Sequence, residues 1–271
     1  MRRLARHLRR NGSLAFVPTM GFLHEGHLSL VRRARRACDS VVVSVFVNPA
    51  QFGPGEDLER YPRDASRDAR LLRREGADVT FCPAAADVYP AGYSTRVEVD
   101  GLTEGLCGRY RPGHFRGVTT VVAKLLNIVG PDVAVFGQKD AQQALVIRRM
   151  VRDLDFDTRV LVCPTVRERD GLALSSRNSL LGPRQRRQAP VLYRSLLLAR
   201  RLVAGGQRSA ATIKRRMRDL IRRESDARVQ YIEMVGTGDL KPVRSVEGRV
   251  LVAVAAWFGR TRLIDNVVVR G

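Results

Sequence analysis

Cysteine is scarce in this chain of 271 residues, and its four copies are widely separated. Cys38, Cys82, Cys107 and Cys163 form no C-x-x-C pair, so their spacing predicts neither a zinc ribbon nor a disulfide framework. We expect them to be small side chains that are buried or half-buried.

Long apolar runs are also missing. The sequence has no stretch of roughly eighteen apolar residues, the length that a transmembrane helix needs. Its N-terminus lacks the apolar segment and small-residue cleavage site of a secretory signal peptide. The chain is therefore predicted to be a soluble cytoplasmic protein with no membrane contact. Its hydrophobic content of 44% is enough for a substantial core.

Lysine is nearly absent, with 4 copies against 44 arginines, and the formal net charge is +21. Clustered cations would favour a nucleic-acid partner, because they release counterions from phosphates. The arginines are instead spread over most segments, in pairs such as Arg32-Arg33 and Arg222-Arg223, which is typical of solvated helix faces. We interpret the excess as compositional bias. The alternative, a nucleic-acid-binding protein, predicts an affinity that falls steeply with salt.

Short apolar, β-branched runs alternate with longer amphipathic segments in the first part of the chain. This alternation is typical of a parallel sheet with crossover helices, so residues 1–165 are predicted to form a Rossmann-like, doubly wound α/β domain. In such sheets, ligands bind at the carboxyl ends of the strands. The predicted strands are residues 14–17, 41–47, 78–82, 133–136 and 158–163, and the predicted helices are residues 28–37, 64–75, 116–129 and 141–153.

The pattern changes at about residue 165. Two arginine-rich amphipathic segments precede three strand-like runs, which predicts a smaller α+β domain over residues 166–271 with an antiparallel sheet. The predicted helices are residues 183–204 and 209–224, and the predicted strands are residues 230–235, 249–257 and 262–269.

The first motif with chemical content follows the predicted strand 14–17 and reads PTMGFLHEGH from Pro18 to His27. Two histidines three residues apart at a helix N-terminus can both face a bound phosphate. A zinc protease needs H-E-x-x-H, and the spacing here is one residue shorter, which argues against zinc. The alternative is that these residues only shape and cap a strand-to-helix turn.

A second motif, FVNPAQF, covers residues 46–52 after the next strand. Asn48 and Gln51 carry neutral amides that both donate and accept hydrogen bonds, which suits recognition of hydroxyls and a carboxylate. The same residues could instead form an ordinary Asn-Pro turn.

A third motif, FGQKDAQQ, covers residues 136–143, again where a strand meets a helix. Gly137 would let a ligand approach the backbone, Lys139 offers a charge to phosphate, and Asp140 could cap the helix or bind a ribose. The alternative is a capped helix with a surface lysine.

The fourth motif, VRERDGLALSSRN, covers residues 166–178. Its paired hydroxyls, Ser175 and Ser176, precede Arg177, and this combination can bind and neutralise phosphate oxygens. It could also be a helix N-cap followed by a solvent arginine.

Together these motifs resemble the pantothenate synthetase family. The first contains the HxGH signature of the nucleotidyltransferase superfamily that includes class I aminoacyl-tRNA synthetases, and PTMGFLHEGHLSLV closely matches the family's own pattern. RPGHFRG at 111–117 and TRLIDN at 261–266 are also similar to family segments. The resemblance implies that pantoate is joined to β-alanine with ATP and Mg²⁺, through a pantoyl-adenylate, in a homodimer whose C-terminal domain closes over the ATP site.

The resemblance also implies roles for individual residues. His24, His27, Lys139, Ser175, Ser176 and Arg177 are expected to be catalytic, with His27 donating a proton or hydrogen bond to the leaving group. The expected ATP-binding residues are Met20, Gly21, Phe22, Leu23, His24, Glu25, Gly26, His27, Gly137, Gln138, Lys139, Asp140, Val166, Leu174, Ser175, Ser176 and Arg177. The expected pantoate and β-alanine contacts are Gln51, Gln143, Asn48, Arg111 and His114.

Three positions depart from the family pattern. Gln138 replaces the usual Glu and so removes a negative charge, while Leu174 replaces a Met of similar volume. Relatives often carry an acidic pair where this chain has Arg67-Asp68. Asp68 is therefore only a candidate magnesium ligand, and Mg²⁺ is expected to be held mainly by the ATP phosphates.

Two further alternatives remain. Another superfamily member could transfer AMP or CMP to a phosphorylated acceptor, but this would call for Arg or Lys in place of the neutral Asn48, Gln51 and Gln143. An inactive relative with a structural role is the other alternative, against which the near completeness of all four motifs argues.

Overall fold

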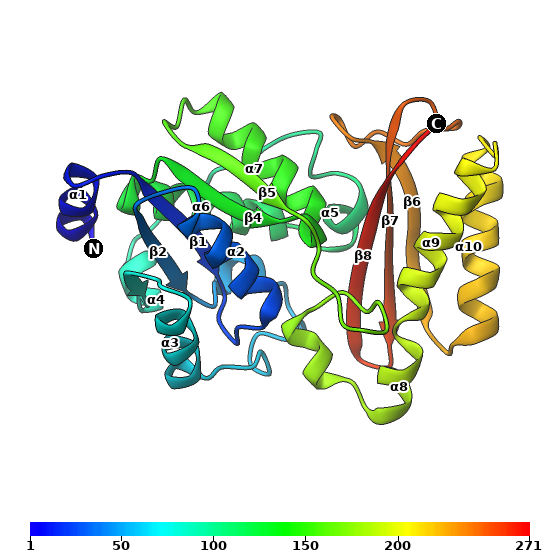
Figure 1. Cartoon of the computed structure of the whole chain (residues 1–271), viewed down its shortest axis with the longest axis horizontal. Helices are drawn as coiled ribbons and strands as arrows, with labels where there is room; N and C mark the ends of the chain where they lie inside the picture. The colour runs from blue at the N-terminus through cyan, green and yellow to red at the C-terminus, as the bar shows by residue number, and fades with distance from the viewer. The chain divides into compact units, whose positions relative to one another are not determined.

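The computed structural model describes residues 1–271, and the chain divides into two compact units. The first unit comprises Met1–Thr103, Cys107–Gln138 and Gln143–Pro164 (Figure 1). The second comprises Glu104–Leu106, Lys139–Gln142 and Thr165–Gly271. The short segment that carries Lys139 thus packs with the second unit, although the strand before it belongs to the first.

The first unit contains a parallel sheet of five strands in the order β3-β2-β1-β4-β5. The strands are β1 (Leu14–Thr19), β2 (Ser40–Val45), β3 (Val79–Phe81), β4 (Val133–Gly137) and β5 (Arg159–Cys163). From β1 the chain runs outward to β2 and β3, then returns to β4 on the other side of β1, so the sheet is doubly wound as predicted. Its topological switch point lies between β1 and β4, where ligands bind in such sheets.

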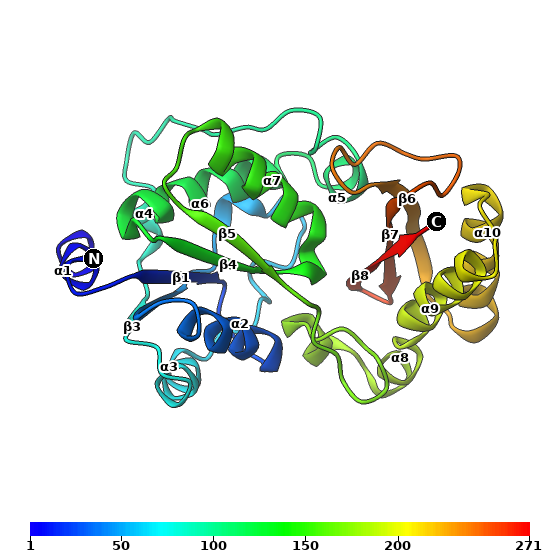
Figure 2. The same ribbon diagram turned by 45° about the horizontal axis from the view of Figure 1, so that its top comes forward.

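Helices lie on both faces of this sheet. The helices in this part of the chain are α1 (Arg2–Arg10), α2 (Glu25–Arg35), α3 (Ala65–Arg74), α4 (Ala85–Val88), α5 (Leu106–Tyr110), α6 (His114–Val129) and α7 (Ala141–Asp153). Figure 2 shows α2 and α3 on one face and α6 and α7 on the other. Ala15, Val17, Val41 and Val43 alternate toward the face that packs against Val31 of α2, as the period of a strand requires.

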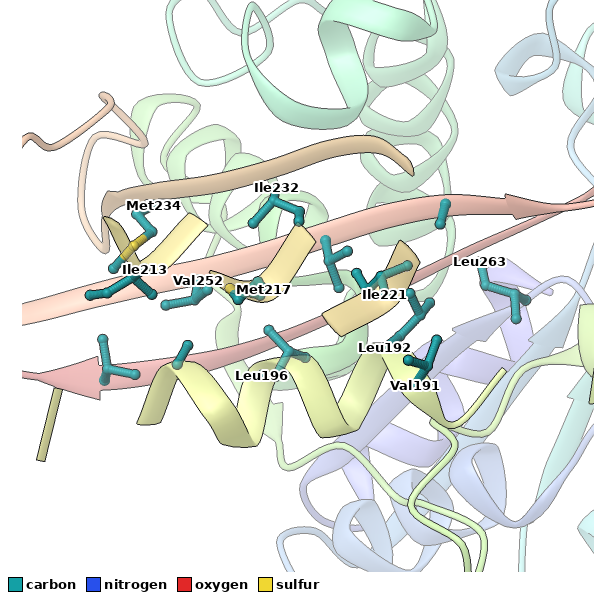
Figure 3. Packing of buried hydrophobic residues seen from close by; sticks show 14 of the residues in the cluster. Val191, Leu192, Leu196, Ile213, Met217, Ile221, Ile232, Met234, Val252 and Leu263 are labelled. Carbon is teal, nitrogen blue, oxygen red and sulfur yellow. The ribbon is translucent and has the colours of Figure 1, made fainter. Parts of the chain in front are cut away.

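The second unit contains an antiparallel sheet in the order β6-β7-β8, as predicted. Its elements are α8 (Pro183–Gln188), α9 (Val191–Ala204), α10 (Ala210–Glu224), β6 (Arg228–Gly236), β7 (Arg249–Phe258) and β8 (Thr261–Arg270). Figure 3 shows the core of this unit, where side chains of α9 and α10 meet one face of the sheet. The labelled residues are Val191, Leu192, Leu196, Ile213, Met217, Ile221, Ile232, Met234, Val252 and Leu263.

One predicted helix is wrong in its extent. The segment 183–204 forms two helices, α8 and α9, separated at Ala189 and Pro190. Proline has no backbone N–H and its ring obstructs the preceding turn, so a continuous helix cannot pass through this position without a break or kink.

The cysteines follow the expectation with one exception. Cys38, Cys107 and Cys163 are buried, whereas Cys82 is exposed just after β3, and all four are free thiols. No helix in residues 1–271 combines the length and apolar character that a membrane span requires.

Candidate active site: two sets of motif residues

The predicted site residues fall into two sets, one in each unit. The first unit holds the segment 20–27, Asn48, Gln51, Arg111, His114, Gly137, Gln138 and Gln143. The second holds Lys139, Asp140, Val166, Leu174, Ser175, Ser176 and Arg177. The geometry of each set is described within its own unit.

The nucleotide motif of the first unit begins with a strained turn after β1. Gly21 has φ +80° and Phe22 has φ +47°, both in the left-handed region. A Cβ on Gly21 would lie 2.9 Å from Val45 Cγ1 and 3.0 Å from Asp68 Oδ2. Glycine is therefore required at this turn for conformational and steric reasons.

Asp68 of α3 holds this turn in place. Its Oδ2 accepts a hydrogen bond from the N–H of Phe22 at 2.7 Å, and its Oδ1 accepts one from the N–H of Leu23 at 2.8 Å. The side chain of Asp68 is almost fully buried, with 1% of the residue exposed. A buried carboxylate that accepts two amide hydrogen bonds is well satisfied.

This geometry gives Asp68 a positioning role and does not fit the magnesium-ligand role that the sequence left open. The neighbouring Arg67 adds a third hydrogen bond to the turn, because its Nη1 donates to the carbonyl of Leu23 at 2.9 Å. Its guanidinium also lies 5.4 Å from the ring centroid of Phe22. Across residues 1–271, no group of three or more His, Cys, Asp or Glu side chains is arranged to hold a metal ion.

His24 and His27 lie at the start of α2, directly after the turn. His24 is the N-cap residue, and the two ring centroids are 4.0 Å apart with an interplanar angle of 33°. His27 Nδ1 accepts a long hydrogen bond of 3.4 Å from the N–H of His24. The proton of a neutral His27 ring is therefore assigned to Nε2, which leaves that atom as a donor.

Glu25 lies between the histidines, and its side chain is engaged elsewhere. It is exposed and forms an ion pair with Arg32, which is seven residues further along α2. Arg32 also pairs with Glu75 at 2.8 Å. Glu25 is a predicted nucleotide contact, but its carboxylate already forms an ion pair within the protein.

Gln51 is the centre of the second motif. It closes a short 3₁₀ turn, Pro49–Gln51, and is buried, with 8% of the residue exposed. Its Nε2 donates to Met20 Sδ at 3.0 Å, which places an amide of the second motif against the nucleotide motif. A thioether is a weak acceptor, so this amide keeps donor capacity for a ligand.

Asn48 supports Gln51 from behind. Its Nδ2 donates to Gln51 Oε1 and to the carbonyl of Gly117, both at 3.1 Å. Its Oδ1 accepts from the N–H of Ala50 at 3.2 Å and from the hydroxyl of Tyr89 at 2.8 Å. All donor and acceptor positions of this buried amide are used within the protein, so the geometry favours a supporting role over direct substrate contact.

Tyr89 is a functional neighbour that the sequence did not indicate. Burial and the nearby Tyr93 raise the pKa of Tyr89 to about 12. The phenol therefore remains protonated near neutral pH and keeps donating its hydrogen bond to Asn48.

Arg111 and His114 also support Gln51, through its backbone. Arg111 Nη2 lies 3.2 Å from the carbonyl oxygen of Gln51, and His114 Nδ1 lies 2.8 Å from the same oxygen. Arg111 also forms a two-pronged ion pair with Glu56 at 2.7 and 2.6 Å. Burial acts to raise the pKa of Glu56, but the hydrogen bond and charge of Arg111 outweigh it and lower that pKa.

The remaining residues of this set lie at the carboxyl end of β4 and at the start of α7. Gly137 and Gln138 are half-buried, and a Cβ on Gly137 would meet no atom within 4 Å. Protein packing therefore does not require glycine at this position, and the open space is compatible with a close ligand. Gln143 is half-buried on the first turn of α7.

In the second unit, Lys139 and Asp140 lie in a 3₁₀ turn, Gln138–Asp140, that leads into α7. The Lys139 side chain is 20% exposed, and its Nζ lies 3.8 Å from Asp140 Oδ1. Two hydrogen bonds connect this segment to other parts of the second unit, one to its backbone and one from its own Gln142 side chain. Asn266 Nδ2 donates to the carbonyl of Lys139 at 2.9 Å, and Gln142 Nε2 donates to the carbonyl of Gly105 at 2.9 Å.

The fourth motif forms a small hairpin followed by a 3₁₀ turn, Ser176–Leu180. The hairpin is closed by a β-bridge between Arg167 and Ala173 and by the N–H of Leu174, which donates to the carbonyl of Val166 at 3.0 Å. Ser175 caps the 3₁₀ turn, since its Oγ accepts from the N–H of Arg177 at 3.3 Å. The N-cap interpretation is thus correct locally, and a hydroxyl that accepts a hydrogen bond in this way still has its own hydrogen to donate.

The hairpin is fixed to β8 by a buried ion pair. Arg167 Nη1 and Nη2 donate to the two carboxylate oxygens of Asp265 at 2.6 and 2.9 Å. The Arg167 guanidinium also lies 3.7 Å from the ring centroid of Tyr193 in α9. Burial raises the pKa of Asp265, while the charge and hydrogen bonds of Arg167 act to lower it.

Comparison with known proteins agrees with the fold and with the motifs. The sequence matches the family described as pantoate-beta-alanine ligase over residues 1–268. It is 58% identical over 256 residues to pantothenate synthetase of Moorella thermoacetica, covering 94% of this chain and 90% of the relative.

Solved structures show the same likeness. A pantothenate synthetase from Thermus thermophilus superimposes with a TM-score of 0.93 at 50% identity, over 97% of this chain and 96% of that one. The Francisella tularensis pantoate-beta-alanine ligase, crystallised with β-γ ATP and β-alanine, gives a TM-score of 0.82 at 34% identity, over 98% and 93% of the two chains. This chain is therefore a member of the pantoate-beta-alanine ligase family.

Proposed function

We propose that this chain condenses pantoate with β-alanine at the expense of ATP, giving pantothenate, AMP and pyrophosphate through a pantoyl-adenylate. The observation that carries the proposal is the contact between Gln51 Nε2 and Met20 Sδ. This contact brings the neutral amide of Gln51, which suits a hydroxy acid, next to Met20 of the motif that suits ATP. Family membership supplies the identity of the two acceptor substrates.

In the first half-reaction, a carboxylate oxygen of pantoate attacks the α-phosphorus of ATP. A new O–P bond forms while the bond between the α-phosphorus and the pyrophosphate oxygen breaks. The protein contributes positioning and charge stabilisation, because no covalent enzyme intermediate is needed. We assign the charge stabilisation to His24, His27, Lys139, Arg177 and the hydroxyls of Ser175 and Ser176.

His27 has a defined part in this step. Its Nδ1 faces the backbone N–H of His24, so Nε2 is the atom that can donate toward a phosphate oxygen. We assign to this Nε2–H the hydrogen bond that stabilises the charge developing on the leaving pyrophosphate. The ring of His24 lies against that of His27, with 4.0 Å between the ring centroids.

In the second half-reaction, the free amine of β-alanine attacks the carbonyl carbon of the adenylate. A C–N bond forms, the C–O bond to AMP breaks, and the amine proton passes to solvent. No nucleophilic side chain is required. Gln51, supported by Asn48, Arg111 and His114, is the proposed pantoate contact, with Gln143 as its partner.

The second unit is proposed to act on the triphosphate. Lys139 supplies a point charge, and the segment from Ser175 to Arg177 supplies two hydroxyls and a guanidinium. In this proposal the domain 166–271 closes over ATP when the nucleotide is bound. Val166 and Leu174, which pair through their backbones at the base of the hairpin, are the proposed adenine neighbours.

Mg²⁺ is proposed to be held by phosphate oxygens of ATP. Asp68 is almost fully buried and its two carboxylate oxygens each accept a hydrogen bond from a backbone amide of the turn, so we assign it a supporting role and not that of a direct ligand. When bound, the ion would neutralise phosphate charge.

We also propose, as the family resemblance implies, a homodimer that works in the cytoplasm. Light scattering coupled to size-exclusion chromatography measures that assembly.

The test is to incubate the purified protein with ATP, pantoate and β-alanine and to measure AMP and pantothenate. Pantothenate formed in equal amount to AMP supports the whole proposal. AMP formed only with another carboxylic acid would show that pantoate is not the substrate, while the proposal that the enzyme forms an acyl-adenylate would stand. Omission of β-alanine should leave one equivalent of pantoyl-adenylate on the enzyme, detectable after acid quench.

A further inference from the structure

Two consecutive polar residues interrupt the apolar strand β8. Asp265 and Asn266 follow Leu263 and Ile264 and precede Val267, yet they are buried, with 3% and 5% of each residue exposed. Buried polar side chains in the middle of a strand are costly unless they are hydrogen-bonded. Their partners therefore indicate why they are there.

The two side chains point to opposite faces of the sheet, because successive residues of a strand alternate. Leu263 and Val269 belong to the core beneath α9 and α10, so Asp265, which shares their parity, faces that side. Its partner Arg167 accordingly stacks on Tyr193 of α9. Asn266 faces the other side of the sheet.

On the helix-covered side, Asp265 holds the base of the 166–174 hairpin. Arg167 binds it through both Nη atoms and also donates to the carbonyl of Gly171 at 3.1 Å. The hairpin runs directly into Ser175, so the position of Arg167 sets where the Ser175–Arg177 segment starts. The N–H of Asn266 donates to Asp265 Oδ1 at 2.8 Å and fixes the carboxylate further.

On the opposite side, Asn266 holds the segment that carries Lys139. Its Nδ2 donates to the carbonyl of Lys139 at 2.9 Å. This bond accounts in part for the packing of Lys139–Gln142 with the second unit. Adjacent residues of one strand therefore anchor Lys139 and Arg167, which are 28 residues apart in sequence.

We infer that Asp265 and Asn266 are positioning residues for adenylate formation. Together they attach Lys139 and the hairpin before Ser175–Arg177 to the same strand. The ammonium of Lys139, the guanidinium of Arg177 and the two serine hydroxyls, which are proposed to bind the triphosphate, are thereby kept at a fixed spacing. The inference rests on the proposed function. It assigns the pair to the ATP half-reaction and not to transfer of the acyl group to β-alanine.

Asn266→Ala is the decisive variant, because it removes the neutral hydrogen bond to the carbonyl of Lys139 without leaving a buried charge. We expect a rise of about five- to tenfold in the KM for ATP or an equal fall in the single-turnover rate of adenylate formation, since one such bond contributes on the order of 1 kcal/mol. The KM for β-alanine and the transfer rate from preformed adenylate should stay within about twofold of wild type. Asp265→Asn, if it folds, should show a larger effect of the same kind.

Leu263→Ala is the matched control. Leu263 lies on the same strand and is buried in the core of the second unit, and it anchors neither segment. Its thermal unfolding midpoint should fall at least as far as that of Asn266→Ala, while the KM for ATP should remain at the wild-type value below the transition. This contrast separates positioning from general loss of stability.

Two results would overturn the inference. One is an Asn266→Ala enzyme with a wild-type KM for ATP and a wild-type rate of adenylate formation. The other is an Asn266→Ala enzyme whose only change is an apparent kcat that falls in proportion to the folded fraction, with the KM for ATP unchanged, as is expected of Leu263→Ala. Calorimetric titration with ATP alone compares wild type and variant without any acceptor. A wild-type protein that binds ATP but makes no AMP from pantoate would break the proposed function and leave this comparison intact.

Discussion

Asp68 in the first unit and Asp265 in the second are both nearly fully buried carboxylates that support a predicted phosphate-binding loop, yet their partners differ. Asp68 accepts two backbone N–H groups, and its closest cation, Arg67, is 3.7 Å away with its side chain 40% exposed. Asp265 instead shares both oxygens with the guanidinium of Arg167, whose side chain is only 16% exposed.

This difference determines what each substitution leaves behind. Replacing Asp68 leaves neutral amides without an acceptor, whereas replacing Asp265 leaves a buried cation without a counterion. An unpaired buried charge costs more than an unpaired amide. The loop of the first unit should therefore tolerate a change in its carboxylate better than the loop of the second.

The largest expected effect is that of Asp265→Asn on stability. The free energy of unfolding of the second unit should fall by about 3–5 kcal/mol, because Arg167 stays buried and loses its charge partner. Trp257 of β7 is the only tryptophan, so its fluorescence reports unfolding of this unit. The double variant Arg167→Leu with Asp265→Leu should recover most of the loss. A single variant as stable as wild type would show that the ion pair is not what holds the hairpin.

Next in size is the effect of the loop residues on catalysis. In the first unit, His27→Ala should slow single-turnover adenylate formation by about 10²–10³-fold, the range for loss of one preorganised donor. In the second unit, Arg177→Ala should have a similar effect. Both side chains are only half-buried, so unfolding should barely change. His7→Ala, on the exposed face of α1, is the matched control and should behave as wild type. Adenylate formation at the wild-type rate in His27→Ala would remove that histidine from the mechanism.

Asp68→Asn should have a smaller effect on stability than Asp265→Asn, about 1.5–3 kcal/mol, which is the range for hydrogen bonds to a charged group. Asparagine can accept from one of the two amides, but its NH₂ group then faces the N–H of Phe22 or Leu23. The strained turn at Gly21 and Phe22 would loosen, and the KM for ATP should rise. Circular dichroism follows unfolding in this unit, which has no tryptophan. A loss greater than that of Asp265→Asn would reverse the comparison of the two units.

The sequence predicted the parallel sheet well because the short apolar runs at 14–17, 41–47 and 133–136 have few alternatives. It also located the motifs, since each follows a predicted strand. The break at Pro190 could have been expected from the proline alone. The supporting residues could not be found in this way, because the loop amides that Asp68 accepts from and the guanidinium that Asp265 binds are 45 or more residues away in sequence. A signal did exist for Asp265 and Asn266, as two polar residues inside an apolar strand.

The smallest expected effect concerns Glu56, whose partly exposed pair with Arg111 bears on the backbone of Gln51. Arg111 lowers the pKa of Glu56 in the folded protein, so the ionised carboxylate stabilises the fold above its unfolded pKa of about 4.3. This stabilisation is lost as the pH falls through the folded pKa. Glu56→Gln should therefore cost about 1 kcal/mol at pH 7, discounted for solvent screening.

The pH dependence of the difference is the sharper observation. As the pH falls through the lowered folded pKa, the wild-type carboxyl becomes protonated, so the stabilities of wild type and Glu56→Gln should converge. Urea unfolding followed by circular dichroism at pH 7 and at acid pH measures both values. Glu59→Gln, an exposed change three residues on, should show no difference at either pH. If the difference in unfolding free energy between wild type and Glu56→Gln stays constant with pH, the packing of the Glu56 side chain, and not its ion pair with Arg111, is what stabilises the region around Gln51.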